Sequence, residues 1–301
     1  MAANLAMLVP AADYDVPWDW AFDAQADALR EAGAEVTALR WTEAEDLGGF
    51  DLVLPLVTWG YHKRYAEWLA FLDKLEADGT RVANPARLLR WNSDKAYLAE
   101  LSAKGIATVP TLEVDHLNEA ALAAAHGVFG TDQLVVKPPV SASAWGTFRL
   151  GPDDPVPAEV HGARMMIQPW LGSVISTGEY SVVLLGGEFS HAVVKRAKDG
   201  DFRVQPEHGG STEGCDPPEG AVALAMAAMA EAPAAATYAR VDFLAGDDGA
   251  LRIIELELIE PALFLHCVPE AKARFAAAVL AEASRLLFPG ARRGPAAARG
   301  R

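Results

Sequence analysis

Short apolar runs alternate with amphipathic segments along the first third of the chain. Apolar runs of strand length lie at 4–10, 35–41, 50–57 and 81–85, and segments with helical spacing that end at a glycine lie at 20–32 and 67–79. Strand–helix–strand alternation at this spacing is typical of parallel sheets. The pattern therefore predicts a four-stranded parallel sheet whose ligand-binding loops follow the carboxyl ends of the strands.

The rest of the chain is richer in predicted strands. A helix is expected over 93–104, capped by Asn92 or Ser93. Gly186 and Gly187 predict a two-residue hairpin turn. The other expected elements are strands near 109–114, 134–138 and 164–171, helices near 117–126, over 221–236 and from residue 269, a hairpin over 178–196 and an antiparallel pair over 238–261. The fold class is therefore α/β in its first part and α+β beyond it.

Length and charge narrow the classes of function. A chain of 301 residues suggests two domains or three compact subdomains around one cleft. Acidic residues outnumber basic ones by 41 to 26, and the net charge of −15 disfavours binding to nucleic acid or to an anionic membrane. The N-terminus lacks the features of a signal peptide, and no apolar run approaches the ~20 residues of a membrane span. The two cysteines suggest no disulfide framework. A cytoplasmic protein with small-molecule ligands is expected.

The usual nucleotide and metal motifs are absent from the sequence. It contains no G-x-x-x-x-G-K-[ST] phosphate loop, no G-x-G-x-x-G after its first strand and no H-E-x-x-H. The informative segment is 238–261, where Asp242 lies on one predicted strand and Glu255 and Glu257 face one way on the next. Carboxylates on a buried strand pair repel one another unless a cation joins them, and such oxygen ligands suit Mg²⁺. The segment predicts a metal site, with a solvent-facing edge strand as the alternative.

This arrangement resembles the ATP-grasp superfamily of carboxylate–amine ligases, which includes glutathione synthetase and D-alanine–D-alanine ligase. The family's last motif has the form D…E-x-N-x-x-[ST]-P, and Asp242, Glu255, Glu257 and the pair Glu260–Pro261 follow it in order. Glu257 departs from the usual Asn and adds a negative charge. The resemblance implies ATP as cosubstrate and Mg²⁺ at the three carboxylates, with Mn²⁺ as the alternative metal.

The same resemblance implies a division of the chain. An N-terminal α/β domain on the substrate side spans 1–90, a central ATP-grasp lobe with a mobile loop at 141–147 spans 91–175, and a C-terminal lobe with the metal site spans 176–288. ATP is expected between the antiparallel sheets of the two lobes. The arginine-rich tail at 289–301 is expected to be disordered.

The resemblance also implies roles for residues between the lobes. Two lysines contact the phosphates, the small-residue loop SASAWGT closes over the γ-phosphate, the backbone of QPWL reads adenine, and a glutamate holds the ribose. Because Pro169 lacks an N–H group, adenine must be met by Trp170 or Leu171. The nucleotide residues are Lys95, Lys137, Ser141, Ser143, Gly146, Gln168, Trp170, Leu171 and Glu179, and the reaction-centre residues are Lys195, Arg203 and Arg240.

Three of these residues have plainer interpretations when taken singly. Lys137 also suits a lysine at a sheet edge, and Glu179 suits an exposed residue that opens a strand. Arg203 also suits a surface ion pair with Asp199 or Asp201. The order and spacing of the whole set favour the nucleotide site.

The segment TWGYHKR at 58–64 follows the third predicted strand, where α/β sheets place ligand-binding loops. Its hydroxyl, aromatic and cationic groups suit an amino-acid-like substrate with a carboxylate. The predicted substrate residues are Thr58, Tyr61, His62 and Arg64, together with Glu260. The alternative is a plain turn with Trp59 and Tyr61 packed inward.

The implied reaction transfers the γ-phosphoryl group of ATP to a substrate carboxylate, and an amine then attacks the acyl phosphate. The segments TWGYHKR, FRVQPEHGG and ELELIEP further resemble a branch near glutathione synthetase that includes O-ureido-serine cyclo-ligases, so intramolecular closure is an alternative. A non-catalytic ATP-binding module and an enzyme that phosphorylates without ligating are further hypotheses. The expected partners are small carboxylate and amine substrates, and a homodimer is left open.

Overall fold

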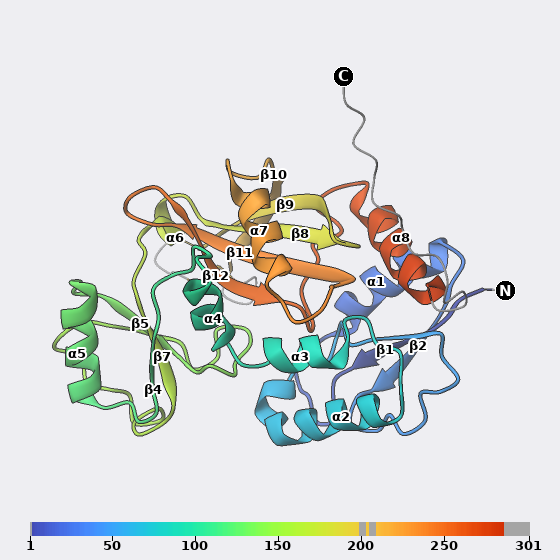
Figure 1. Cartoon of the computed structure of the whole chain (residues 1–301), viewed down its shortest axis with the longest axis horizontal. Helices are drawn as coiled ribbons and strands as arrows, with labels where there is room; N and C mark the ends of the chain where they lie inside the picture. The colour runs from blue at the N-terminus through green and yellow to red at the C-terminus, as the bar shows by residue number, and fades with distance from the viewer. Residues whose placement is uncertain (1, 199–202, 205–208, 286–301) are drawn as a thin grey trace.

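The computed structural model describes residues 2–198, 203–204 and 209–285. Within them, a parallel sheet of three strands is followed by antiparallel sheets of four and five strands, which confirms the mixed fold class (Figure 1). The predicted tail at 289–301 lies outside the described residues. None of the helices within the described ranges has the length and apolar character needed to cross a membrane.

The parallel sheet has the strand order β2-β1-β3. It is built from β1 (Asn4–Val9), β2 (Glu35–Arg40) and β3 (Leu52–Leu54), together with helices α1 (Asp19–Glu31), η1 (Tyr61–Arg64) and α2 (Tyr65–Ala77). The prediction of a fourth strand was wrong, because Val82 forms only a single bridge to Val53 before the chain turns into a helix at Pro85. The loop after β3 leads to η1 at the carboxyl edge of this sheet.

The helix predicted over 93–104 begins later than expected, and a helix that was not predicted precedes it, with a break at 93–96 between the two. These are α3 (Ala86–Asn92) and α4 (Tyr97–Ala103). The Asn92 amide bonds the carbonyl of Leu256 and the N–H of Leu258 at 2.8 and 2.9 Å instead of capping a helix. The Ser93 hydroxyl accepts a hydrogen bond from the Trp68 indole at 2.9 Å. These tertiary contacts hold the break in which Lys95 lies.

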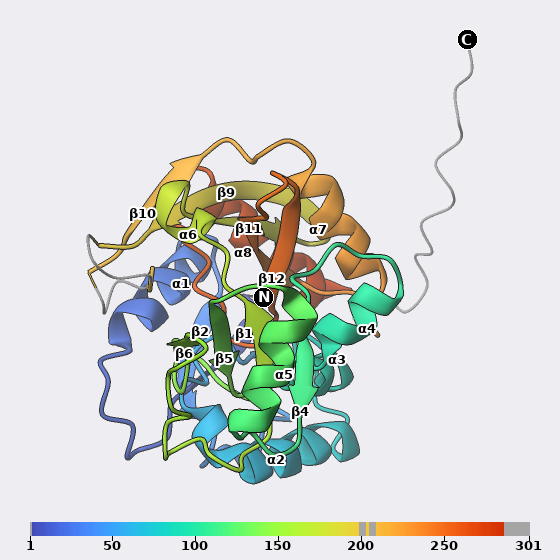
Figure 2. The ribbon, with the colours of Figure 1, turned by 90° about the vertical axis from the view of Figure 1, so that its left-hand side faces the viewer.

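The four-stranded sheet has the order β4-β7-β5-β6 and carries helix α5 on one face (Figure 2). Its elements are β4 (Leu112–Val114), α5 (Glu119–Phe129), β5 (Leu134–Lys137), β6 (Phe148–Leu150) and β7 (Met165–Pro169). Leu134 and Val136 of β5 are buried in the core with Leu122 of α5. Because side chains alternate along a strand, Val135 and Lys137 point to the opposite face, which lines a cavity.

The five-stranded sheet has the order β10-β9-β8-β11-β12. Its elements are α6 (Ser173–Ser176), β8 (Glu179–Leu185), β9 (Glu188–Arg196), β10 (Ser211–Cys215), α7 (Ala221–Ala230), β11 (Tyr238–Ala245), β12 (Leu251–Glu257) and α8 (Ala271–Ser284). The predicted hairpin turn is confirmed, with φ of 63° at Gly186 and 82° at Gly187. Helices α4 and α7 share one core with this sheet. Phe275 of α8 instead packs in the core of the parallel sheet with Leu5 and Leu29, which joins the last helix to the first sheet.

Candidate active site

A cavity of about 850 Å³ lies where the three sheets meet. Sites for small molecules typically enclose ~300–1,000 Å³, so this cavity has the size of a ligand site. Of the residues predicted from the sequence, it is lined by Tyr61, His62, Lys95, Lys137, Ser141, Ser143, Gln168, Trp170, Leu171, Glu179, Lys195, Arg203, Arg240, Asp242, Glu255, Glu257 and Glu260. The fold thus gathers at one place residues that lie up to 199 positions apart in sequence.

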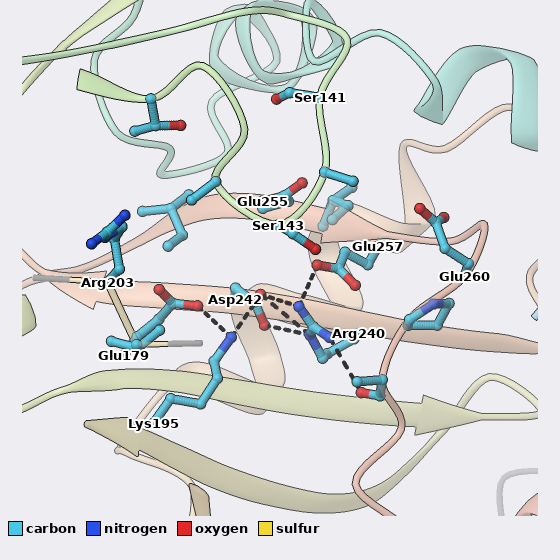
Figure 3. A pocket seen from close by; sticks show the side chains of 18 of the residues that line it. Ser141, Ser143, Glu179, Lys195, Arg203, Arg240, Asp242, Glu255, Glu257 and Glu260 are labelled. Atoms are coloured by element: carbon cyan, nitrogen blue, oxygen red, sulfur yellow. Dashed lines mark hydrogen bonds and ion pairs between the residues drawn. The ribbon is translucent and has the colours of Figure 1, made fainter. Parts of the chain in front are cut away.

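The floor of the cavity carries a buried network of alternating charges (Figure 3). Strand periodicity places Arg240 and Asp242 on one face of β11, where Arg240 is opposite Glu257 of β12 and Asp242 is opposite Glu255. On the other side, Glu179 of β8 is opposite Lys195 of β9. The sheet register therefore brings both signs of charge together on one surface.

Ion pairs connect this network from one end to the other. The Lys195 ammonium contacts Glu179 and lies 3.0 Å from Oδ2 of Asp242. Arg240 donates from Nε to Oδ1 and from Nη2 to Oδ2 of Asp242, at 2.9 and 2.8 Å, and also pairs with Glu257. The Ser181 hydroxyl donates to Asp242 at 2.6 Å. Both oxygens of Asp242 are therefore engaged by protein donors.

Burial and pairing oppose each other in setting the pKa values here. Burial acts to raise the pKa of Asp242, but Arg240 and Lys195 outweigh it and hold the pKa below its ordinary value. Burial raises the pKa of Glu257, and the attraction of Arg240 offsets this only in part. The pKa of Lys195 rises although burial alone would lower it, because Asp242 and Glu179 favour its charged form. The network thus keeps both cations charged.

The carboxylates can be compared with the needs of a magnesium ion. No group of three or more Asp, Glu, His or Cys side chains within the described ranges is arranged to hold a metal, so Asp242, Glu255 and Glu257 do not form the three-carboxylate cluster predicted from the sequence. Asp242 is occupied by its cations, whereas the ion pairs of Glu255 and Glu257 each involve only Oε1. Mg²⁺ usually takes one or two carboxylates together with phosphate oxygens. Glu255 and Glu257 fit that smaller donor set.

Lys95 and Lys137 lie across the cavity from this network. The Lys95 ammonium donates to the carbonyl oxygen of Ser141 at 2.6 Å and lies 3.2 Å from Oε1 of Glu255. Burial lowers the pKa of Lys137, although Glu255 partly offsets the effect. Lys95 therefore ties the central loop to the C-terminal sheet, and Lys137 presents its amine to the same space.

The loop at 141–147 has an unusual backbone. Ser143, Ala144 and Gly146 have φ of 49°, 55° and 67°. A Cβ atom at Gly146 would lie 2.8 Å from Cγ of Pro138, so only glycine fits there without a shift. Gly146 does not itself line the cavity, whereas Ser141 and Ser143 do. Trp145 is 53% exposed, and its ring lies 5.8 Å from that of His62.

The segment at 168–171 lines the far part of the cavity. The Gln168 amide donates to Oγ1 of Thr111 at 2.8 Å. The N–H of Trp170 donates to the carbonyl of Gln133 at 2.9 Å, and the Arg149 guanidinium covers the Trp170 ring at 4.3 Å. Two backbone N–H groups are expected to donate to adenine, those of Trp170 and Leu171. Because the N–H of Trp170 already donates to Gln133, the N–H of Leu171 is the remaining candidate.

The structure divides the predicted substrate residues. Tyr61 and His62 line the cavity, but Thr58 and Arg64 do not. The Thr58 hydroxyl is buried and donates to the carbonyl of Pro55 at 3.0 Å. Arg64 pairs instead with Asp13 at 2.7 Å and with Glu67 at 2.9 Å. These two assignments are therefore corrected: Thr58 bonds within its own loop, and Arg64 is held away from the cavity by Glu67 and by Asp13, which lies 51 positions before it.

His62 enters the cavity as a neutral ring. Both of its nitrogens are buried and lack a hydrogen-bond partner in the described part of the chain. Burial lowers its pKa to about 4. Burial also raises the pKa of the neighbouring Tyr61 well above its ordinary range. The N-terminal side of the cavity is therefore uncharged and aromatic.

The sequence interpretation missed several residues at the site. The Phe264 ring lies 5.3 Å from the Arg240 guanidinium and 6.0 Å from the Lys195 ammonium. Trp20 and Trp59 pair at 5.6 Å on the cavity lining. Phe264 lies three positions after the ELELIEP segment, and this closeness to a predicted site segment could have identified it. No sequence feature near Trp20 indicates that it lines the cavity. Asp199 and Asp201, the alternative partners of Arg203, lie outside the described residues.

Known proteins share both the sequence and this architecture. A family model described as the N-terminal domain of D-cycloserine synthetase DcsG matches residues 6–84. The cycloserine biosynthesis protein DcsG of Streptomyces lavendulae is 31% identical over 286 residues, which cover 89% of this chain and 93% of that protein. The crystal structure of D-cycloserine synthetase DcsG matches with a TM-score of 0.80 and 29% identity, over 94% of this chain and 100% of that one.

More distant structures show the fold alone. D-alanine–D-alanine ligase from Bacillus anthracis matches with a TM-score of 0.69 and 17% identity, over 95% of this chain and 98% of that one. The ATP-grasp ligase PsnB matches with a TM-score of 0.63 and 18% identity, over 92% and 99%. Together with the closer likeness to DcsG, these matches confirm the resemblance that the sequence indicates. The chain belongs to the DcsG family of ATP-grasp ligases.

Proposed function

We propose that this enzyme uses ATP and Mg²⁺ to convert a small amino-acid-like carboxylate to its acyl phosphate and joins it to an amine, releasing ADP and phosphate. The observation that carries the proposal is the buried charge network around Arg240 and Asp242, which faces Lys95 and Lys137 across one cavity. Phosphoryl transfer depends on positioning and charge neutralisation, and this cavity offers both. The names of the relatives, a cycloserine synthetase and a D-alanine–D-alanine ligase, support the substrate class.

The nucleotide is assigned to the part of the cavity between the two antiparallel sheets. The amines of Lys95 and Lys137 contact its phosphates, and the loop at 141–147 covers them. Leu171 provides the remaining backbone donor for adenine, and Glu179 accepts from the ribose hydroxyls. Because Glu179 also pairs with Lys195, ribose binding is coupled to the position of that lysine.

Glu255 and Glu257 would hold the magnesium ion, since their donor set fits a site completed by phosphate oxygens. When bound, Mg²⁺ supplies positive charge to the phosphates and lowers the barrier to transfer. Asp242 joins the site only if it releases Arg240 or Lys195. When one of these ion pairs breaks, Asp242 becomes available as a metal ligand and the released Arg240 or Lys195 becomes available as a cation for the phosphates.

Arg240, Lys195 and Arg203 are assigned to the reaction centre. An oxygen of the substrate carboxylate bonds to the γ-phosphorus as the bond from that phosphorus to its bridging oxygen breaks and ADP leaves. The amine nitrogen then bonds to the acyl carbon, the acyl C–O bond breaks, phosphate leaves, and a proton passes from nitrogen to solvent. The three cations balance the charge that moves onto oxygen in both steps.

A second candidate is intramolecular closure, in which acid and amine belong to one molecule. The observation that favours it is the likeness to D-cycloserine synthetase at 29% identity over 94% of this chain. Cyclisation needs no second substrate pocket. It differs from intermolecular ligation only in where the nitrogen comes from.

The test is ADP formation with Mg²⁺ and ATP over a panel of both enantiomers of alanine, serine and O-ureidoserine, with and without added amine. Mass spectrometry of the products separates ligation from cyclisation, and hydroxylamine traps the acyl phosphate as a hydroxamate. Asp242→Asn should abolish ADP formation, while Glu188→Gln, an exposed change on β9 outside the cavity, should leave it intact. ADP formation that depends on no carboxylate would refute the proposal, and a stable acyl phosphate never transferred to nitrogen would indicate a kinase.

A further inference from the structure

One carboxylate of the cavity differs from the others in its pairing. Five carboxylates among the described residues line the cavity. Four of them have a lysine or arginine within ion-pair distance, namely Glu179, Asp242, Glu255 and Glu257. Glu260 has no such partner among the lysines, arginines and histidines of the described ranges. The cavity therefore presents one acid whose countercharge the protein does not supply.

The backbone around Glu260 is held firmly. The Asn84 amide donates to the carbonyl of Leu258 at 2.8 Å, and the Tyr238 hydroxyl lies between the carbonyls of Ala83 and Ile259, at 2.9 and 3.1 Å. On the other side, Nη1 of Arg240 donates to the carbonyl of Ala262 at 3.3 Å. Hydrogen bonds thus flank Glu260 on both sides in the chain, so the backbone from which its side chain extends is held in place.

Glu260 lies at the end of the cavity away from Glu179 and Arg203 (Figure 3). If Glu179 holds the ribose, as proposed above, the phosphates extend past Asp242, and Glu260 lies beyond them where the second substrate binds. The bond from Arg240 to Ala262 keeps that arginine beside the Glu260 segment. The substrate end of the cavity therefore offers a cation for a carboxylate, Arg240, and an acid without an ion-pair partner in the described chain, Glu260.

The charges around Glu260 specify what it accepts. Burial and the neighbouring carboxylates of Glu257 and Glu255 raise the pKa of Glu260 to about 8, and Lys95 offsets this only in part. A cationic group bound beside Glu260 would favour its charged form. The nearby phenol of Tyr61 stays neutral. A positively charged group with hydrogen-bond donors complements this surface, and a primary ammonium is such a group.

We propose that the Glu260 carboxylate binds the free α-ammonium group of the substrate, so that the site takes unblocked amino acids and discriminates against N-acylated and des-amino analogues. This inference rests on the proposed function only for the end of the cavity at which the substrate lies. In an α-amino acid the ammonium and the carboxylate are both attached to the α-carbon. One small molecule can therefore place its ammonium at Glu260 and its carboxylate toward Arg240, which bonds the backbone two residues beyond Glu260.

The test measures binding independently of turnover. Calorimetric titrations use the full chain with Mg²⁺ and the non-hydrolysable analogue AMP-PNP, and compare both enantiomers of alanine and O-ureidoserine with their N-acetyl and des-amino counterparts. The wild type should bind one free amino acid at least about tenfold more tightly than its counterparts, and Glu260→Gln should weaken that binding by about 10- to 100-fold while leaving the counterparts unchanged. Glu260→Asp should recover part of the loss.

The outcomes separate this inference from the proposed function. Tight binding with the expected discrimination but no ADP formation would refute the proposed function and leave the ammonium site standing. Equal weakening of free and blocked compounds in Glu260→Gln, or failure of the wild type to prefer any free amino acid, would overturn the ammonium site. The melting temperature of Glu260→Gln should not fall, because the variant removes a half-buried acid that has no ion-pair partner in the described chain, and Glu188→Gln serves as the exposed control.

Discussion

Lys195 offers a sharp test of the buried charge network. Its ammonium lies between Glu179 and Asp242, and only 6% of the residue is exposed. Lys195→Met keeps the length of the side chain but removes its charge. Asp242 retains Arg240 and Ser181, whereas the ion pair of Glu179 is lost. The substitution therefore leaves one buried carboxylate without its compensating charge.

The expected cost follows from that uncompensated charge. Removing one partner of a buried ion pair typically costs ~3–5 kcal/mol, because the remaining charge stays desolvated. With about 2 °C of melting temperature per kcal/mol in a large domain, Lys195→Met should lower the melting temperature by roughly 6–10 °C at pH 7. Glu179→Gln combined with Lys195→Met should lose less than Lys195→Met alone, since the double variant no longer buries an unpaired charge.

The pH dependence of the stability of Lys195→Met provides a second, independent test of the charge network. Burial raises the pKa of Glu179 above its ordinary 4.5, against the attraction of Lys195. In Lys195→Met that attraction is gone, so between 4.5 and the raised pKa the folded state binds more protons than the unfolded state. Stability of the variant must then fall as pH rises through this window. The difference in melting temperature between variant and wild type should shrink from pH 7 to pH 5.

The assay is thermal unfolding monitored by circular dichroism. Asp248→Asn is the control, because Asp248 is an exposed acid in the turn between β11 and β12 and forms an ion pair with Arg252. The control should leave the melting temperature nearly unchanged. A loss in Lys195→Met no larger than that of the control, or a loss that grows on acidification, would show that the network is not a compensated set of charges.

Three further predictions concern other parts of the chain. The pKa of His62 is about 4 against an ordinary 6.5, so between these pH values the folded state binds fewer protons than the unfolded state. Lowering the pH from 6.5 to 4 should therefore reduce the free energy of unfolding by up to about 3 kcal/mol. Stability measured from pH 7 to 4 should depend less on pH in His62→Gln. Gly146→Ala should raise KM for ATP severalfold with little change in melting temperature, because the φ of 67° and the contact with Pro138 force the loop to shift. Gly127→Ala is the control and should leave KM unchanged, because Gly127 lies inside α5 with open space around it. Phe275→Ala should cost ~3–5 kcal/mol in urea unfolding, since this fully buried ring joins α8 to the parallel sheet, and a loss below about 1 kcal/mol would contradict that packing.

Local patterns sufficed for much of the fold. The two-residue periodicity of β11 and β12 placed Asp242, Glu255 and Glu257 on the cavity face, and the glycine pair at 186–187 marked its hairpin. The order of lysines and carboxylates was enough to identify the ATP-grasp resemblance. These features are encoded within a few neighbouring residues, where the geometry of a strand or turn fixes which side chains face one way.

Other expectations failed where distant parts of the chain intervene. The break between α3 and α4 exists because Asn92 and Tyr97 bond the backbone near Leu256, 164 and 159 positions away. Arg64 is removed from the cavity by Asp13, 51 positions before it. Helical spacing and loop position contain no information about such partners.

The sequence by itself determined the elements, the family and the set of charged residues from which the site is made. Only the tertiary structure decided how those charges pair: that Asp242 is held by Lys195 and Arg240, and that Glu260 keeps no cation in the described chain. The physical reason is that periodicity fixes the face on which a side chain lies, whereas its pKa and its partners depend on what the folded chain places across a buried, weakly screened space.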